Sequence, residues 1–509
     1  YLAQRDSEWM GKIYGGDDSR DLETTLTLSS VEYDTSSTTF PIQMVSNTLI
    51  QGAGGREAPS ILNSQYMSQV LIMREVSNIQ LKDIEIKNGV TMQNGGGIEM
   101  INATDNTFDN VVVSGSVAAK RGGGIYIRND EGPVRDDGEV IVTDVELNEN
   151  NSLLEGGGLY FNNADLYISG VEVIDNNTHN SETQYHGGGI FGQDAGNVVI
   201  ENSIIDGNTA SITVGTAGSW GGGIQFENVN VGLRNVQITD NKAIDKAGAI
   251  YLRDSNLNMY NCTIADNELL YGAWGAGIHA QKTGLGGHNY LYITNSIIRD
   301  NQNATFPNTG SQLAGDVFSS FGIDMYIHHT DIQGLGNYSN PYEMMAYFQL
   351  MLQDPAPGHE NTNIDEDPLF ITVDGNDYHL DSGSPCIDAG TDTLTVEGEL
   401  IVDIPESEYF GAEPDMGANE WETQNLGDIN GDGINEVFEV QAIGVNEFEM
   451  QVFDRWGSII FNSSNKDYGW DGRSYSGEEL NNGTYMYHVY LTDVNGKPWV
   501  YNGEINLMK

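Results

Sequence analysis

Short apolar runs alternate with polar residues along positions 49–302, and they recur at an interval typical of repeat proteins. Each repeat is marked by three small residues, mostly glycine, followed by Ile or Leu. The runs begin at Gly95, Gly122, Gly156, Gly187, Gly221, Ala247 and Gly275. Successive starts are 27, 34, 31, 34, 26 and 28 residues apart. A period of this size, with insertions of variable length, predicts a solenoid.

A second sequence motif, a six-residue phrase, lies between the glycine runs and indicates the type of solenoid. It reads apolar, spacer, turn residue, small or apolar, spacer, apolar, and its nine copies lie at residues 81–86, 108–113, 142–147, 168–173, 200–205, 233–238, 259–264, 293–298 and 327–332. The third position holds Asp83, Asn110, Asp144, Gly170, Asn202, Asn235, Asn261, Asn295 and His329. All but His329 are residues that tolerate a left-handed backbone, so we expect two short strands to meet there at a tight bend. Because the pieces have a period of two and no helical period, the pattern predicts a parallel β-helix with one coil per repeat.

The sequence pattern divides the chain into four segments. We expect residues 1–48 to form an N-terminal cap and the first coils, 49–302 the regular β-helix, 303–426 irregular terminal coils and a closing segment, and 427–509 a separate domain. A short helix is expected at residues 342–352. The last domain combines short alternating strands with Asn-Gly and Asp-Gly turn signals, a density that predicts a small immunoglobulin-like β-sandwich. The predicted fold class is therefore all-β.

The net charge narrows the classes of partner. Lys and Arg number 22 against 74 Asp and Glu, so the formal charge is 22 − 74 = −52. Such a surface repels nucleic acid and anionic lipid, which argues against a nucleic-acid role. The acidic side chains either hold divalent cations or solvate an extracellular protein. Two cysteines are too few for a disulfide framework, and no apolar run is long enough to span a membrane. The chain starts at Tyr1 without a signal-peptide core, so we expect a processed or trimmed N-terminus.

Two resemblances follow from particular motifs. The words Asp-Pro-Leu-Phe at residues 367–370, Gly-Ser-Pro-Cys-Ile-Asp-Ala-Gly at 383–390 and Asp-Met-Gly-Ala-Asn-Glu at 415–420 resemble the closing segment of right-handed parallel β-helix surface proteins of the Bacteroidota. The words Asn-Gly-Asp-Gly-Ile-Asn-Glu-Val-Phe at 430–438, Phe-Asp-Arg-Trp-Gly at 453–457 and Gly-Trp-Asp-Gly at 469–472 resemble the gliding-motility-associated C-terminal domain. That domain is the type B sorting domain of the type IX secretion system.

The second resemblance implies a cellular route. It implies export through the type IX translocon, an outer-membrane barrel protein as partner, and an extracellular location attached to the Gram-negative cell surface. The glycine repeats also resemble those of chlamydial polymorphic surface proteins, in which the array is a surface scaffold. Glu436 stands where the sorting family usually has Asp, and Asp428-Ile429 replaces a common Thr-Pro.

One stretch has the spacing of a calcium loop. Oxygen-bearing residues stand at positions 1, 3, 5 and 12, Gly433 stands at position 6 for the turn, and Ile434 offers its carbonyl. The full ligand set is Asp428, Asn430, Asp432, Ile434, Glu436 and Glu439. No helices flank the loop, so it is not an EF-hand. The alternatives are a Ca²⁺ site and an ordinary Asx- and Gly-rich turn.

A column of residues is expected beside the glycine runs, because one residue precedes each of them. Its members are Asn94, Arg121, Glu155, His186, Trp220, Lys246 and Trp274. The bare glycine strip itself indicates that something packs flat against it or that the chain bends sharply on entering it. Aromatic rings beside polar groups stack on sugars, so residues 121, 155, 186, 220, 246 and 274 are candidate glycan ligands. The alternative is that Trp220 and Trp274 cover the glycines of neighbouring coils.

The functions that these features leave open are a structural or adhesive surface β-helix, glycan binding, assembly into fibres, and catalysis on polysaccharides. Lyases, epimerases and hydrolases occur on β-helices, but the sequence lacks an Arg-x-Pro-x-x-Arg lyase motif and an Asp-Asp pair followed by Gly-His-Gly. The catalytic hypothesis brings His279, His288, His328 and His329 together near the C-terminal coils. A non-enzymatic surface protein is the main expectation.

Overall fold

The computed structural model describes residues 24–334, 362–421 and 428–507, apart from gaps. The gaps are residues 56–57, 131–139, 181–186, 213–217, 272–274, 284–288, 305–311, 317–321, 374–375, 397, 410, 430–437, 439–444, 454–456, 466–468, 471, 475–479, 481–482 and 494–497. The helix expected at 342–352 lies outside the described residues. The chain divides into two compact units, Tyr1–Trp421 and Glu422–Lys509.

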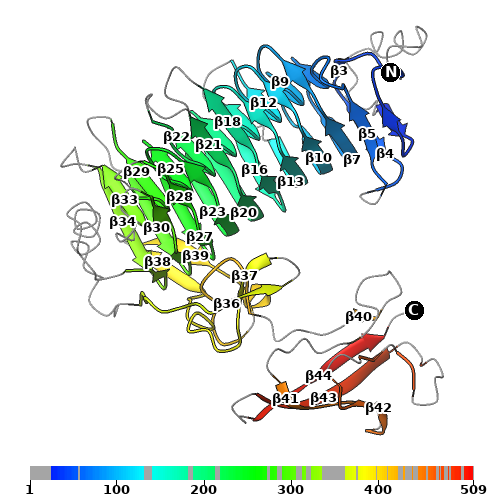
Figure 1. The fold of residues 1–509 in the computed structure, drawn as a ribbon, viewed down its shortest axis with the longest axis vertical. Coiled ribbons are helices and arrows are strands. Elements are labelled where there is room, and N and C mark those ends of the chain that lie inside the picture. The colour runs from blue at the N-terminus through cyan, green and yellow to red at the C-terminus, as the bar shows by residue number, and fades with distance from the viewer. Residues whose placement is uncertain are drawn as a thin grey trace. The chain divides into compact units, whose positions relative to one another are not determined.

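The first unit is a parallel β-helix whose coils are built from three sheets (Figure 1). Strand pairing within these three sheets is parallel throughout the described residues. We call the sheets A, B and C, with 17, 10 and 8 described strands. Sheet A comprises β1 Thr24–Leu28, β2 Glu32–Tyr33, β4 Thr48–Gly52, β5 Ser60–Asn63, β7 Ile79–Lys87, β10 Thr107–Ser114, β13 Val140–Asn148, β16 Leu166–Ser169, β17 Glu172–Ile174, β20 Asn197–Asp206, β23 Asn230–Thr239, β26 Asn256–Tyr260, β27 Thr263–Ala265, β30 Asn289–Thr294, β31 Ile297–Arg299, β34 Ile323–His328 and β35 Asp331–Ile332.

Sheets B and C complete each coil. Sheet B comprises β3 Ile42–Gln43, β6 Leu71–Arg74, β9 Ile98–Ile101, β12 Ile125–Arg128, β15 Leu159–Asn162, β19 Ile190–Gln193, β22 Ile224–Glu227, β25 Ile250–Arg253, β29 Ile278–Gln281 and β33 Leu313–Asp316. Sheet C comprises β8 Val90–Thr91, β11 Val117–Ala118, β14 Asn151–Ser152, β18 Asn177–Asn180, β21 Thr209–Ile212, β24 Lys242–Ala243, β28 Glu268–Leu269 and β32 Gln302–Asn303. The glycine runs lead into sheet B, and the nine-copy phrase forms sheet A.

The register of sheet A confirms that the repeats stack in phase. Leu81 pairs with Phe108, and Phe108 pairs with Val142, so equivalent apolar positions lie one above another. These side chains face a continuous buried core. Burial of apolar surface contributes about 25 cal/mol per Å² to the free energy of folding. Columns of buried Ile, Val and Leu therefore provide most of the stabilisation of a solenoid.

The tight bend in the middle of each sheet A segment is also confirmed. All nine third-position residues have positive φ, from 46° at His329 to 64° at Gly170. A side chain in this conformation costs about 1 kcal/mol or more unless it is Gly, Asn or Asp, which explains the composition of the column.

A closing segment, residues 362–421, packs against the last coils. It contains two antiparallel hairpins, β36 Phe370–Val373 with β37 Asn376–Leu380 and β38 Thr393–Val396 with β39 Glu399–Asp403, and the 3₁₀ turn η1 Glu406–Glu408. The segment lies along the outer side of sheet A: Asn295 exchanges hydrogen bonds with Thr391 over 2.8 and 2.9 Å, and the Ala418 N–H donates to Thr263 Oγ1 over 3.0 Å. The closing segment therefore covers part of the outer face of sheet A in the last coils of the β-helix.

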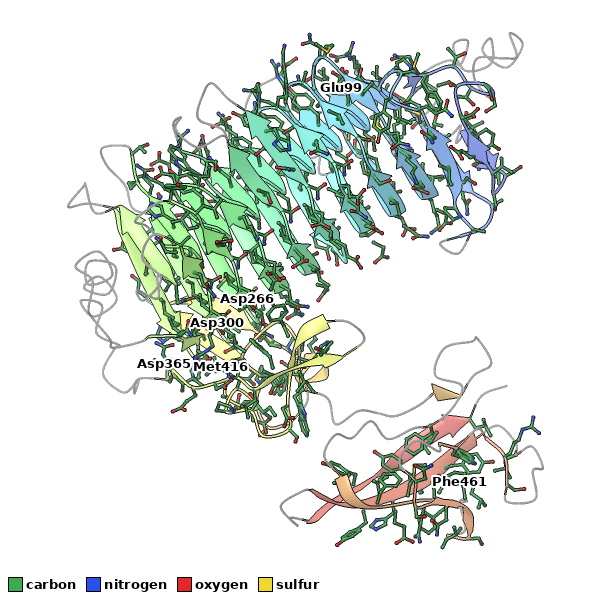
Figure 2. The ribbon with its side chains drawn as sticks, in the orientation of Figure 1. Glu99, Asp266, Asp300, Asp365, Met416 and Phe461 are labelled. Atoms are coloured by element: carbon green, nitrogen blue, oxygen red, sulfur yellow. The ribbon has the colours of Figure 1, made fainter. Side chains whose placement is uncertain are left out.

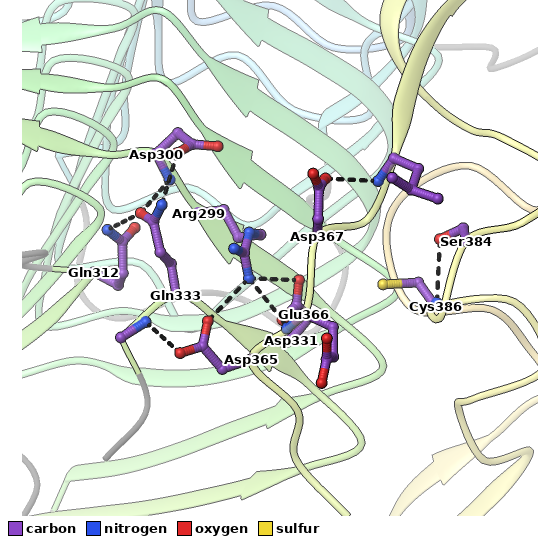
Figure 3. A network of polar contacts seen from close by, with 12 residues as sticks. Arg299, Asp300, Gln312, Asp331, Gln333, Asp365, Glu366, Asp367, Ser384 and Cys386 are labelled. Carbon is purple, nitrogen blue, oxygen red and sulfur yellow. Dashed lines mark hydrogen bonds and ion pairs between the residues drawn. The ribbon is translucent and has the colours of Figure 1, made fainter. Parts of the chain in front are cut away.

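An ion-pair network joins the closing segment to the final coil (Figure 3). Arg299 Nη1 donates to both carboxylate oxygens of Asp331, over 3.0 and 3.1 Å, and to Asp365 over 3.2 Å. Asp331 is fully buried. Burial raises the pKa of Asp331 to about 6, although the guanidinium of Arg299 opposes the rise.

The second unit has its own core. Its five-stranded sheet has the order β40 Asp428–Ile429, β44 Pro498–Leu507, β43 Gly483–Asp493, β41 Val445–Phe453 and β42 Ile459–Ser463. All pairs are antiparallel except β40 with β44. Phe438 and Trp470 form a β-bridge with each other outside this sheet. The ring centroid of Phe438 lies 4.9 Å from that of Tyr487, and the ring centroid of Trp470 lies 5.1 Å from that of Tyr485. The all-β prediction of a β-helix followed by a small β-domain is confirmed.

Candidate functional site

The first residue of six of the glycine runs turns the chain into sheet B. Gly95, Gly122, Gly156, Gly187 and Gly221 all have φ between 60° and 67°, and Ala247 takes the same conformation at 51°. The sharp bend expected from the sequence is present.

The second and third glycines are packed too closely for ordinary side chains. A Cβ atom on Gly157 would lie 2.4 Å from Gly188 O and 2.5 Å from Asn177 N, both backbone atoms. A Cβ atom on Gly158 would lie 3.1 Å from Cγ of Asn176. The bare strip therefore packs against neighbouring backbone and against a buried asparagine, as the sequence indicated. Its role here is structural.

A ladder of buried amides runs beneath the third glycine. It comprises Asn150, Asn176, Asn208, Asn241, Asn267 and Asn301, and Gln312 follows it. Each Nδ2 donates to the next side-chain oxygen and to a backbone carbonyl, as Asn208 does to Asn241 Oδ1 over 2.9 Å and Val173 O over 2.7 Å. These residues were not predicted from the sequence. The signal was available, because each follows an acidic or glycine residue at the end of a sheet A segment.

The candidate glycan ligands lie in register over sheet B. Arg121 forms a parallel bridge with Glu155, and Trp220 forms one with Lys246, so these residues stack in successive coils. His186 and Trp274 lie outside the described residues. Asn94 accepts a hydrogen bond from the Arg121 N–H over 3.3 Å.

Their side chains contact a second column on sheet B. Register places Glu99, Tyr126, Tyr160, Phe191, Gln225, Tyr251 and His279 at equivalent positions of successive strands. Ring centroids are 5.1 Å apart for Tyr126 and Tyr160 and 5.3 Å for Tyr160 and Phe191. The guanidinium of Arg121 lies 5.3 Å from the Tyr160 ring. Tyr160 is buried, and burial raises its pKa.

The same arrangement recurs further along the sheet. The Trp220 ring lies 5.0 Å from Tyr251, and its Nε1–H donates to Asp245 over 3.2 Å. The Lys246 ammonium lies 5.1 Å from the Trp220 centroid and donates to Gln281 Oε1 over 3.1 Å. Trp220 therefore has an aromatic neighbour, a cation and a hydrogen-bond acceptor within the chain. These contacts are those expected of a ring that covers its neighbours.

Charged pairs lie within and beside this column. Glu99, labelled in Figure 2, is 3% exposed and pairs with Arg74. Glu227 is 6% exposed, pairs with Arg253 and accepts a hydrogen bond from Gln225 Nε2 over 2.8 Å. Burial raises the pKa of Glu227, and Arg253 opposes the rise. In a chain of net charge −52, this face of sheet B concentrates arginines and aromatic rings. We call this face the sheet B strip. It comprises Arg74, Glu99, Arg121, Tyr126, Glu155, Tyr160, Phe191, Trp220, Gln225, Glu227, Lys246, Tyr251, Arg253 and His279.

The four histidines of the catalytic hypothesis do not form one described cluster. His279 lies on β29 in sheet B and stacks on Tyr251 at 5.6 Å, whereas His328 ends β34 in sheet A and His329 occupies the bend that follows. His288 lies outside the described residues. Buried His279 belongs to the sheet B strip.

Of the predicted calcium ligands, only Asp428 lies among the described residues. Asp428 begins β40, which pairs with β44, whereas Asn430, Asp432, Ile434, Glu436 and Glu439 lie outside the described residues. Across the residues that are described, no group of three or more His, Cys, Asp or Glu side chains forms a metal site. No described helix is long and apolar enough to cross a membrane.

Comparison with known families agrees with this division of the chain. Residues 69–231 match the right handed β-helix region family, and residues 421–506 match the CHU_C type IX secretion signal domain. A comparison with curated proteins found no significant match. This chain is thus a right-handed parallel β-helix protein with a type IX secretion signal domain at residues 421–506. The signal domain indicates export to a cell-surface or extracellular location.

One solved structure similar to this chain is full-length tailspike protein 2 of Escherichia coli O157:H7 bacteriophage CAB120. The identity is 11% and the TM-score 0.32, over 95% of this chain and 59% of the tailspike chain. This chain therefore spans less than two thirds of that protein. At this TM-score the likeness carries no argument.

Proposed function

We propose that this protein is a structural or adhesive component of the outer surface of a Gram-negative cell. The observation that carries the proposal is the type IX secretion signal domain joined in one chain to a long β-helix. The signal serves export, so the β-helix is the part displayed. The charge of −52 on the whole chain keeps such a display dispersed in water. The type IX translocon and an outer-membrane barrel protein are the proposed partners.

Export is tested with the full chain and a chain ending at residue 421. Both are expressed in a host with a functional type IX system and located by surface proteolysis of intact cells. The full chain is expected to be accessible to protease, and the shortened chain is expected to stay inside. A mutant host without the translocon is the control. Surface exposure of the shortened chain would contradict the proposed role of residues 422–509.

The proposed contact surface is the sheet B strip, and glycans are the proposed ligand class. Support comes from the regular column of Arg121, Glu155, Trp220 and Lys246 above stacked aromatic rings. Sugar rings stack on aromatic faces while their hydroxyls bond to flanking polar groups. His186 and Trp274 belong to the same proposed set.

A double variant tests this surface. Trp220→Ala with Trp274→Ala is compared with the wild-type chain on a glycan array, and Tyr66→Ala, which removes an aromatic ring that is 54% exposed away from sheet B, is the matched control. Selective loss of glycan binding in the double variant supports the strip. Unchanged glycan binding with a lower melting temperature assigns the tryptophans to covering neighbouring coils.

A second candidate is a polysaccharide-active enzyme, and a specific observation favours retaining it. Glu227 is buried with a raised pKa in the same strip as Tyr251 and His279, and such titratable groups serve as general acids and bases. Incubation with uronic-acid polymers separates the candidates. New double-bond absorbance or reducing ends, lost in Glu227→Gln, would establish catalysis. Their absence leaves the adhesive function.

We also propose that these rods self-assemble into fibres, because an exposed strand edge at the end of a β-helix would pair with a second chain. Sedimentation of the full chain over a range of concentrations tests this. Concentration-dependent large species support fibres, and a monomer at every concentration contradicts them.

A further inference from the structure

A lysine, an asparagine and an aspartate meet where sheet B turns into sheet A near the end of the helix. Lys282 directly follows β29, and Asn289 begins β30. Lys282 Nζ lies 3.2 Å from Asn289 Oδ1 and 3.4 Å from Asp254 Oδ1. Asp254 directly follows β25 in the preceding coil, so the three side chains are held by two adjacent turns.

The turn that carries Lys282 departs from its neighbours. In five earlier coils the residue after the sheet B strand is Asn or Asp in the left-handed conformation, at Asn102, Asn163, Asp194, Asn228 and Asp254. Register pairs Arg253 with Gln281, so Lys282 is next in this column. At Lys282 a long amine thus stands where these coils have a short turn residue, beside the carboxylate of the coil before it.

Asn289 occupies an interior position. It is 3% exposed, and the next coil places Ile323, which is also buried, opposite it. Its Nδ2 atom is buried without a hydrogen-bond partner. An amide nitrogen left unpaired in the interior costs about 1–3 kcal/mol. The ladder asparagines, by contrast, are fully bonded, so this amide is not explained by the architecture of the repeat.

We propose that Lys282 and Asn289 form an intramolecular isopeptide bond, with Asp254 moving the protons. The unprotonated Lys282 amine attacks Cγ of Asn289 and forms the new C–N bond. Asp254 accepts a proton from this nitrogen and supplies one to the amide nitrogen of Asn289. The old C–N bond breaks and ammonia leaves. The step needs no oxidant, reductant or further reactant.

The geometry supplies what this reaction otherwise lacks. An amide and an amine react extremely slowly in water, but groups held in contact reach effective molarities of about 10⁵ M or more. A positioned carboxyl group adds general acid–base catalysis, typically about 10²–10⁴-fold. The side chain of Lys282 is 14% exposed and that of Asp254 is 25% exposed, so most of each side chain is covered by protein. The bond would replace the unpaired amide nitrogen by a secondary amide and covalently close the connection between two sheets.

Mass spectrometry of the full chain tests the proposal. The intact denatured protein is expected to weigh about 17 Da less than its sequence predicts, because one ammonia is lost. Trypsin is expected not to cut after Lys282, because its amine is acylated, so the peptide starting at Thr283 is absent. Lys282→Arg restores both the mass and the cut, whereas Lys120→Arg, at an exposed lysine that donates to Gln93 without a carboxylate partner, restores neither.

Each outcome decides the proposal. A wild-type chain of full sequence mass that is cut after Lys282 overturns it, and the contact is then a hydrogen bond only. A deficit that persists in Lys282→Arg also overturns it, since succinimide formation elsewhere loses ammonia too. Asp254→Asn is expected to slow bond formation by at least about 100-fold, which a time course after refolding measures.

Discussion

The side-chain amide of Asn150 donates to Oδ1 of Asn176 over 3.1 Å, and the backbone N–H of Asn150 donates to the same oxygen over 3.0 Å. One carboxamide therefore serves both the backbone and the side chain of the coil before it. Repetition of this contact through five further coils makes the ladder the polar counterpart of the apolar columns. Its members are fully buried, or nearly so, and their exchange for apolar residues would leave backbone groups unpaired.

We predict that Asn150→Ala lowers the free energy of unfolding by about 3 kcal/mol or more. The substitution leaves the Ser116 N–H and the Val113 carbonyl without their bonds to this side chain. Asn151→Ala is the matched control, because the side chain of Asn151 only donates to Glu149 O near the surface. Thermal unfolding of both variants measures the difference. Equal melting temperatures would show that the ladder adds little.

The glycine strip should tolerate alanine differently at its two packed positions. Gly157→Ala brings a Cβ to 2.4 Å from backbone and is expected to destabilise by about 3 kcal/mol, whereas Gly158→Ala at 3.1 Å should cost about 1 kcal/mol. Ala249 already stands at the third position of its own run. Ala276 stands at the second position of its run, near the end of the β-helix. Gly157 differs from Ala276 because the coils on both sides of Gly157 carry complete glycine triplets. Chemical denaturation of the two variants checks the order, and the reverse order would contradict it.

The closing segment should give the β-helix a pH-dependent stability. Asp415 is 1% exposed, and burial raises its pKa from 3.8 to about 6, although N–H groups of Trp421 and Asp388 bond its carboxylate. A raised folded-state pKa means that stability from the protonated form is fully present below pH 3.8 and is lost as pH rises through 6. Between these limits wild type should lose up to about 3 kcal/mol more than Asp415→Asn.

Unfolding measured from pH 4 to pH 7.5 tests this slope. Asp105→Asn is the control, because Asp105 is exposed in a left-handed turn that asparagine also adopts. The control should follow the wild-type curve, which includes the general effect of the acidic surface. Parallel curves for wild type and Asp415→Asn would contradict the assignment.

Calcium is expected to stabilise the second unit. If Asp428, Asn430, Asp432, Ile434, Glu436 and Glu439 hold the ion, calcium at 100 times its Kd raises the free energy of unfolding by about 2.7 kcal/mol. Calorimetry of the full chain is carried out with calcium and with a chelator. The unfolding transition of the second unit is identified as the one that a chain ending at residue 421 lacks, and its shift in temperature is measured. Glu439→Gln should abolish the shift and Glu449→Gln, at an exposed position on β41, should retain it. A chelator without effect would remove the site.

The candidate site was only partly predictable from the sequence. The column of Arg121, Glu155, Trp220 and Lys246 follows from its position before each glycine run. Its partners, Tyr160 and Tyr251, were not identified. The sequence shows that they follow the glycine runs, but it does not show which residue of a neighbouring coil packs over them. The pairing of Glu227 with Arg253 is equally invisible, since the two residues belong to different coils.

The sequence alone determined the parallel β-helix, its in-phase register and the secretion signal. These depend on local rules: alternation of apolar residues, and Asn, Asp or Gly where φ must be positive. Tertiary structure decided which polar groups meet, including Asn150 with Asn176 and Lys282 with both Asn289 and Asp254. The physical reason is that stacking brings together residues one coil apart, and insertions of variable length hide that correspondence until the backbone is in place.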